Sequence, residues 1–239
     1  MSSSGAIWHD VECGSYAADL RLWEELAERC GGPILELGCG TGRVALHLAR
    51  HGYEVIGLDL DAGLLRELEA RGAGLDLQAH HADARSFELG REVSLVLAPT
   101  HLLQLLPGPG DRSECLRRVA EALRPGGVFA AAILEGMPES DGAPPPLPDV
   151  REIDGWVYSS LAVEAAVGPG EIVVRRLRQL VSPDGALSEE PNVVRIATFS
   201  AASLEADSEP LGLVPVERRE VPPTELHVGS LAVVLERGK

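Results

Sequence analysis

The sequence predicts an α/β fold: a Rossmann-like, doubly wound sheet, mostly parallel with an antiparallel last strand, and a small antiparallel β insertion. Two observations lead to it. Short apolar runs alternate with segments of helical periodicity between residues 15 and 135. From Val150 to about Thr198 the helical periodicity stops, and short strand-like runs separated by Gly/Pro turns replace it.

Each expected element has its own local signal. Apolar residues three and four apart indicate helices, and apolar runs bounded by turn residues indicate strands. Asp61, Asp111 and Ser200 are expected helix caps. The expected helices cover 15–30, 43–50, 62–72, 111–124 and a final segment from Ser200, and the expected core strands cover 33–37, 53–59, 76–81, 93–98, 128–134, 214–220 and 225–236.

The composition is that of a globular chain with an acidic surface. Of 239 residues 45% are hydrophobic, and 21 Lys and Arg stand against 37 Asp and Glu, giving a net charge of −16. Such a surface repels phosphate, which argues against nucleic acid or an anionic membrane as partner. The four cysteines form no C-x-x-C pair, and neither a signal peptide nor a long apolar run is visible. We therefore expect a cytoplasmic protein with reduced thiols.

The most informative stretch is PILELGCGTG, residues 33–42. A buried strand is followed by Gly38, Gly40 and Gly42, and then by a segment of helical spacing. Glycine can take positive φ and lets a ligand approach the backbone, while the first amides of a helix favour a polar or anionic group. The spacing differs from the dinucleotide motif G-x-G-x-x-G because Arg43 stands where the third glycine belongs, and no P-loop lysine follows.

An acidic residue ends the next strand. Asp59 lies 21 residues after Gly38, at a strand end where a carboxylate can accept hydrogen bonds from a ribose diol. A helix cap is the alternative role, and Asp61 can serve it instead.

His80 and His81 are adjacent in a strand and so point to opposite faces, which excludes chelation of one metal ion by the pair. We expect no metal site.

The glycine stretch, Asp59, Asp83 and the LRPGG turn at 123–127 together resemble the class I methyltransferases that use S-adenosyl-L-methionine (SAM), over about residues 30–135. The resemblance implies SAM as cofactor and S-adenosylhomocysteine as product. It implies that Asp83 binds the adenine amine and that the Ala84 N–H meets a ring nitrogen. The residues that it implies at the cofactor are Tyr16, Glu36, Gly38, Cys39, Gly40, Gly42, Asp59, Leu60, Asp83, Ala84 and Pro99.

Two of the candidate residues keep an alternative role. Tyr16 reaches the methionine end of the cofactor in the resembled enzymes, although composition alone favours a tyrosine that packs under a helix end. His101 follows the fourth strand at the edge where open parallel sheets bind ligands. It is the candidate general base for an acceptor that arrives protonated, or it is a loop histidine that lines the pocket.

The chain divides at residue 135 in this interpretation. Residues 1–135 and 199–239 form the SAM-binding core, and 136–198 form a β-rich insertion whose proline-rich start, 136–149, is a flap over the acceptor. The resembled enzymes include methyltransferases of amines and amino sugars.

The expected function is therefore methyl transfer from SAM to a nitrogen or oxygen of a small-molecule acceptor. We expect neither nucleic acid nor membrane as a partner, and a homodimer stays open. The alternatives are a non-catalytic SAM-binding protein of the same fold and a nicotinamide-dependent oxidoreductase, against which the glycine spacing argues.

Overall fold

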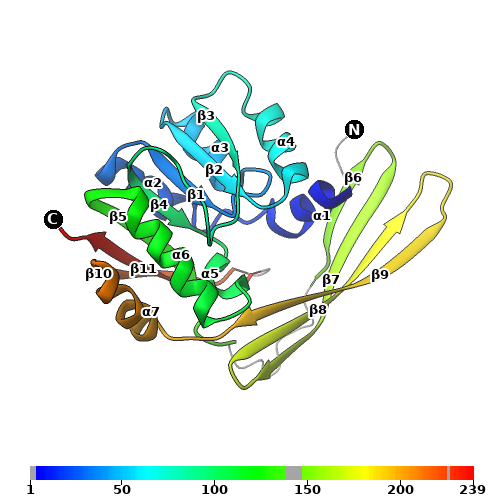
Figure 1. Cartoon of the computed structure of the whole chain (residues 1–239). Helices are drawn as coiled ribbons and strands as arrows, with labels where there is room; N and C mark the ends of the chain where they lie inside the picture. The colour runs from blue at the N-terminus through cyan, green and yellow to red at the C-terminus, as the bar shows by residue number, and fades with distance from the viewer. Residues whose placement is uncertain (1–3, 138–146, 225–226) are drawn as a thin grey trace.

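A computed structural model describes residues 4–137, 147–224 and 227–239, which form a seven-stranded sheet and a separate four-stranded sheet (Figure 1). The strand order in the large sheet is β10-β11-β5-β4-β1-β2-β3. Its first five strands in sequence pair in parallel, and β11 runs antiparallel between β5 and β10, as predicted. The strands are β1 (Ile34–Leu37), β2 (Val55–Asp59), β3 (Leu77–His81), β4 (Val93–Ala98), β5 (Leu123–Ile133), β10 (Leu213–Val221) and β11 (Ser230–Arg237).

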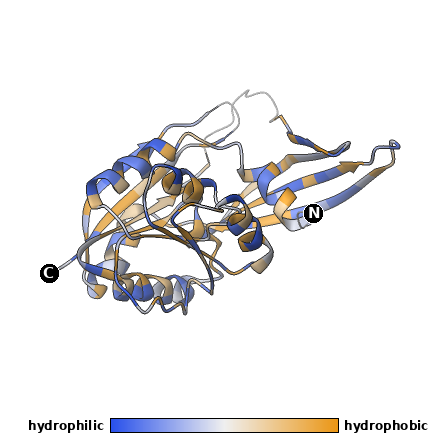
Figure 2. Cartoon of the chain, turned by 90° about the horizontal axis from the view of Figure 1, so that it is seen from above, coloured by the Kyte–Doolittle hydropathy of each residue, from blue (hydrophilic) through white to orange (hydrophobic). Residues whose placement is uncertain are grey.

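Helices cover both faces of this sheet (Figure 1). Hydrophobic residues colour much of the ribbon of this sheet in Figure 2. Each face has its own layer of buried apolar side chains. One layer contains side chains of α2, α3 and α4, and the other contains side chains of α5, α6 and α7. Burial on both sides explains why the central strands are almost continuously apolar. The helices are α1 (Ser4–Cys13), α2 (Leu20–Cys30), α3 (Arg43–Arg50), α4 (Ala62–Arg71), α5 (Leu102–Leu105), α6 (Pro109–Ala122) and α7 (Ala201–Ser208), with a 3₁₀ turn at Glu209–Leu211.

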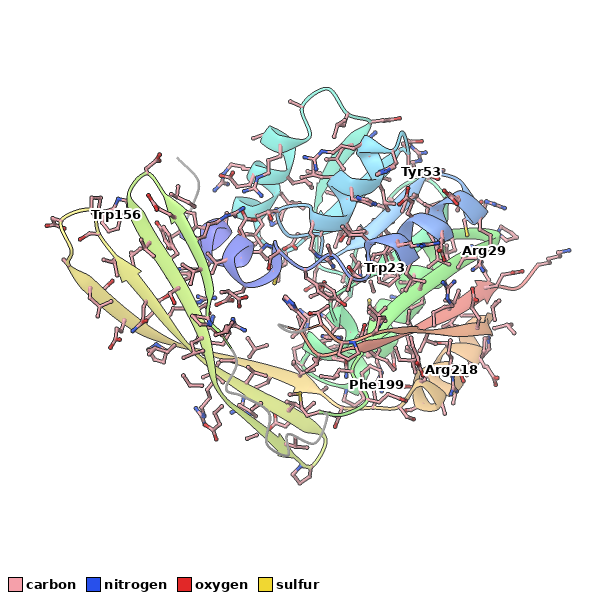
Figure 3. The ribbon with its side chains drawn as sticks, turned by 180° about the vertical axis from the view of Figure 1, so that it is seen from behind. Trp23, Arg29, Tyr53, Trp156, Phe199 and Arg218 are labelled. Atoms are coloured by element: carbon pink, nitrogen blue, oxygen red, sulfur yellow. The ribbon has the colours of Figure 1, made fainter. Side chains whose placement is uncertain are left out.

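The insertion is an antiparallel meander of four strands in the order β6-β7-β8-β9. The predicted turns at 168–170 and 183–185 connect its strands. Trp156, at the start of β7, lies in this sheet, well apart from Trp23 of α2, which is buried in the core (Figure 3). The strands are β6 (Asp149–Ile153), β7 (Trp156–Gly168), β8 (Glu171–Val181) and β9 (Leu187–Ala197).

The first helix is the main difference from the sequence-based expectation. Ser4–Cys13 forms α1, which the sequence did not predict, and the helix expected from residue 15 begins at Leu20. Tyr16 therefore lies between two helices and not at a helix start. Its carbonyl accepts a hydrogen bond from the Arg43 side chain at 3.0 Å, a contact that fixes this connection outside either helix.

Smaller differences concern element ends. Asp61 and Ser200 cap α4 and α7 through their side chains, as expected, whereas α6 begins earlier than predicted and Gly108, not Asp111, is its cap. Strand β5 begins within the LRPGG turn. The predicted flap, 136–149, lies mostly outside the described residues. No helix in the described ranges is long and apolar enough to cross a membrane.

Helix α1 connects the two sheets. It packs against α4 on the core side and against β6 and β7 on the insertion side. Trp8 makes an edge-to-face contact with Tyr158 of β7, with ring centroids 5.2 Å apart. Glu12 accepts hydrogen bonds from Ser160 of β7 and Arg178 of β8, both at 2.8 Å. Through these contacts a short helix fixes the insertion beside the carboxyl ends of the core strands.

Candidate active site

The glycine turn after β1 is joined directly to the end of β2. Gly38, Gly40 and Gly42 have φ of 63°, 56° and 98°, values that favour glycine. The Gly40 N–H donates to Asp59 Oδ2 at 2.8 Å, and the Asp61 N–H donates to Asp59 Oδ1 at 2.9 Å. Two backbone amides thus orient the Asp59 carboxylate, and its remaining lone pairs can accept from a ligand hydroxyl.

Protein side chains occupy the space in front of these glycines. A Cβ placed on Gly40 would lie 2.2 Å from His9 Nε2, and one on Gly42 would lie 2.3 Å from Leu68 Cδ1. His9 also contacts the Thr41 hydroxyl at 3.2 Å. The close approach that glycine permits is therefore used, at these positions, by α1 and α4. Contact between the glycine turn and a cofactor stays a prediction. Such contact would use the backbone N–H and C=O groups of the turn.

Glu36 carries an unpaired acceptor into the same region. Its side chain is 3% exposed, and burial raises its pKa to about 8. The Ala45 N–H at the start of α3 supports the carboxyl group, yet Glu36 Oε2 is buried with no hydrogen-bond partner among the described residues. A buried polar atom without a partner is costly. It suits a ligand that brings a hydrogen-bond donor such as an ammonium group, so Glu36 and Asp59 together fit an amino-acid-bearing nucleoside such as SAM.

At the end of the site where the resemblance places adenine, one of the two expected binding groups already has a protein partner. Arg85 forms a fork on the Asp83 carboxylate at 2.6–3.1 Å and a second contact to Asp111 at 2.6 Å; these hydrogen bonds hold the pKa of Asp83 below its usual range. The Ala84 N–H has no acceptor within the described residues. Leu60 is 66% exposed beside Asp59, an apolar surface on which a base can lie.

Two other residues that the resemblance implies at the cofactor, Cys39 and Pro99, are buried. The Cys39 thiol is buried against Gly57 of β2, and burial raises its pKa. Its N–H donates to Leu58 O at 3.0 Å. Pro99 is buried at the end of β4. Cys39 therefore supports the turn from behind.

Arg43, the first residue of α3, organises the side of the site next to α2. Its guanidinium pairs with Asp19 at 2.5 and 2.8 Å and donates to the Thr100 hydroxyl at 3.1 Å. It also lies over the Tyr16 ring, 5.0 Å from the centroid. Asp19 is 1% exposed and accepts a further hydrogen bond from Trp23 Nε1 at 2.8 Å. Arg43 thereby links Tyr16 to Thr100, which lies two residues beyond the end of β4.

The end of β4 places His101 in the same region. Thr100 and His101 have φ of 55° and 63°, a costly conformation for residues with side chains that is found often at functional sites. Burial lowers the pKa of His101 to about 4, so its imidazole is neutral at physiological pH. The Tyr16 ring also contacts His227, with ring centroids 4.8 Å apart.

The insertion presents paired charges to this region. Arg176 contacts Asp149 and donates to the Ser160 hydroxyl at 2.8 Å, and Arg178 contacts Glu12. The carboxylate hydrogen bonds hold the pKa of Glu12 low in spite of its burial. Each of these arginines has a carboxylate partner. The face of the insertion that packs against α1, here called its inner face, is therefore polar without a strong net charge.

Sequence analysis missed the contributions of α1 and of Arg43. No motif marks His9 or Glu12, because their partners lie 32 and at least 148 positions away. Arg43 directly follows the last glycine, a position at which a long cationic side chain reaches back over the turn. That placement was the one signal available, and sequence analysis used it only to exclude a dinucleotide motif.

Part of the chain is similar to known methyltransferases. Residues 34–127 match the family model described as a methyltransferase domain. A segment of 112 residues is 35% identical to the dTDP-3-amino-3,6-dideoxy-alpha-D-glucopyranose N,N-dimethyltransferase of Streptomyces fradiae, covering 47% of this chain and 43% of that protein. The chain spans about half the length of the curated relatives it matches.

Solved structures extend the similarity to the whole fold. The sugar N-methyltransferase KedS8 from Streptoalloteichus superposes with a TM-score of 0.77 at 20% identity, covering 100% of this chain and 94% of that one. The SAM-bound amino pentose methyltransferase CalS10 from Micromonospora echinaspora superposes with a TM-score of 0.74 at 18% identity, covering 98% and 97%. At these identities the likeness is one of fold.

The fold is that of SAM-dependent methyltransferase structures, and part of the chain matches a methyltransferase domain, in agreement with the class predicted from the sequence. The curated relatives that this segment matches include a sugar N,N-dimethyltransferase and an O-methyltransferase of ubiquinone biosynthesis.

The two aspartates at the end of β2 give a matched test of the ribose assignment. Asp59→Ala should weaken SAM binding by about 1.5–3 kcal/mol, since it removes the acceptor oriented by Gly40. Asp61→Ala removes only the cap of α4, which binds the Gly63 and Leu64 amides. Calorimetric titration with SAM measures both, and equal dissociation constants for the two variants would contradict the assignment.

The raised pKa of Glu36 predicts how the stability of the protein depends on pH. Its pKa is raised on folding, so its contribution to stability is complete below about pH 4.5 and is lost as the pH rises through about 8. Glu36→Gln should therefore gain thermal stability relative to wild type as the pH rises over that range, in protein without SAM. Glu69→Gln, at an exposed position on α4, is the control and should follow wild type. Parallel pH profiles for all three proteins would count against a buried, protonated Glu36.

Proposed function

We propose that this protein transfers a methyl group from SAM to a nitrogen of a small amine or amino sugar, with the acceptor bound between the carboxyl ends of β4 and β5 and the inner face of the insertion. The observation that carries the proposal is the glycine turn, in which Asp59 is fixed by Gly40 and the buried Glu36 oxygen lacks a partner. Names of similar proteins, a sugar N-methyltransferase among them, favour nitrogen over oxygen as the acceptor atom.

The cofactor supplies an activated methyl group when it is bound, so the chain has little covalent chemistry to perform. Its residues position the partners and exclude water. Glu36, Asp59 and the Ala84 N–H would hold the cofactor, and Tyr16, fixed by Arg43, would border its reactive end. Oriented binding of this kind accounts for most of the rate in a bimolecular transfer.

His101 acts in this proposal by orienting the acceptor. A group whose pKa lies near 4 is a weak base at neutral pH, but a neutral imidazole accepts a hydrogen bond from an N–H well. His101 would thus direct the nitrogen lone pair, and the ammonium proton leaves to solvent before transfer. This assignment replaces the general base considered from sequence.

The charges of the insertion favour an acceptor without a pyrophosphate. Arg176 and Arg178, which face α1, each have a carboxylate partner, and the chain as a whole carries a charge of −16. A free amino sugar or amine meets neither repulsion nor the cost of breaking these ion pairs. A nucleotide-linked sugar would have to displace Asp149 or Glu12 from its arginine.

Transfer of isotope-labelled methyl from SAM, followed by mass spectrometry, tests the proposal with matched acceptors. The two acceptors compared are 3-amino-3,6-dideoxyglucose and 6-deoxyglucose, which has a hydroxyl at C3 in place of the amine, each free and linked to dTDP. We expect label on the amino sugar and little on its hydroxyl counterpart, with the free form preferred. Label on the hydroxyl compounds alone would overturn the choice of nitrogen. SAM binding without transfer to any amine in a wider panel would favour the non-catalytic alternative.

The role of His101 is tested by its pH dependence. His101→Ala should lower turnover about tenfold through poorer orientation while SAM affinity changes little, and His101→Gln, which can still accept a hydrogen bond, should recover part of the loss. Because the imidazole is already neutral, the loss should be the same from about pH 6 to 9. An acidic limb near neutral pH that disappears in both variants would show instead that His101 is the base.

A further inference from the structure

Two histidines and a glutamate converge between α2 and α3, at the opposite end of α3 from the glycine turn. His47 Nε2 lies 3.4 Å from Glu24 Oε2, and His51 Nε2 lies 3.3 Å from Glu24 Oε1. One ligand atom from each residue lies within 4.8 Å of the others. Within the described ranges this is the one group of three or more His, Cys, Asp or Glu residues so arranged.

The backbone explains why these side chains meet. His47 and His51 are four residues apart at the end of α3, so they point from the same face, and their ring centroids are 4.4 Å apart. Glu24 faces them from the middle of α2, which packs against α3. The sequence predicted no metal site, since it has no C-x-x-C pair and its adjacent histidines, His80 and His81, point to opposite faces of a strand. The spacing H-x-x-x-H on a helix is the sequence signal of this cluster.

The hydrogen bond at His51 fixes where its lone pair lies. His51 Nδ1 is 2.8 Å from the His47 carbonyl, which can only accept, so Nδ1 carries the proton. The lone pair of a neutral His51 is therefore on Nε2, directed at Glu24. A backbone carbonyl that orients a histidine in this way is the usual outer partner of a metal-binding imidazole.

When both histidines are neutral, no positive charge in the cluster balances the Glu24 carboxylate. His47 Nε2 is buried and has no hydrogen-bond partner among the described residues. The Nε2 lone pair of His51 faces a carboxylate oxygen, which is also an acceptor. Acceptors that face one another repel unless a proton or a cation lies between them. The arrangement thus needs a positive charge at its centre.

We propose that Glu24, His47 and His51 bind a divalent transition-metal ion of the zinc class, with solvent completing the coordination. Tetrahedral zinc with bonds of about 2.0–2.1 Å has ligand-to-ligand distances of about 3.4 Å, close to the two nitrogen-to-oxygen distances found here. His51 is 44% exposed, which leaves access for the ion and for water. The ion joins the middle of α2 to the end of α3, so its role is structural and independent of methyl transfer.

The test uses the full chain stripped with a chelator and titrated with Zn²⁺ in competition with a chromogenic chelator. We expect one equivalent to bind to wild type, and His47→Ala, His51→Ala and Glu24→Gln each to weaken binding about tenfold or more. His80→Ala, a histidine outside the cluster, is the control and should bind as wild type. Zn²⁺ should raise the unfolding temperature of wild type and not of the three variants.

Cobalt(II) gives a second readout that does not depend on variant stability. Strong visible bands without a thiolate charge-transfer band in the near ultraviolet indicate nitrogen and oxygen ligands and support the site. A thiolate band would assign the metal to cysteines and overturn the proposal. Absence of binding, or equal binding by wild type and the three variants, would show that the cluster is only a proton-dependent ion pair.

Discussion

A buried ion pair between Arg43 and Asp19 holds together the segments around the glycine turn. Burial of two charges is expensive unless further hydrogen bonds satisfy them, and here Trp23, the Tyr16 carbonyl and the Thr100 hydroxyl supply those bonds. The pair is therefore better understood as a device for specificity than as a source of stability. It fixes the α1–α2 connection and the end of β4 relative to the glycine turn.

The core was predictable because its signals are local. Continuous apolar runs place β1 to β5, and side-chain caps such as Asp61 and Ser200 mark helix starts within a few residues. Asp59 was placed correctly beside the glycine turn because parallel strands that end together bring their following residues to one edge.

The rest depends on partners distant in sequence. Helix α1 is defined by Trp8 and Glu12, whose contacts lie in the insertion, so its own residues carry no signal of that role. The fork between Asp83 and Arg85 could not be foreseen from spacing, because side-chain conformation decides whether the carboxylate faces a neighbour or a ligand. The left-handed backbone at His101 is equally hidden, since no glycine marks it.

The contacts of α1 decide which segments have to be exchanged together in a chimera of this protein and a related one. A chimera that replaces only the insertion strands would leave Glu12 buried without Arg178, and a buried charge without its partner is strongly destabilising. An exchange of the insertion between proteins of this fold therefore has to move two separate segments of the chain at once: α1 and the strands that begin at Asp149.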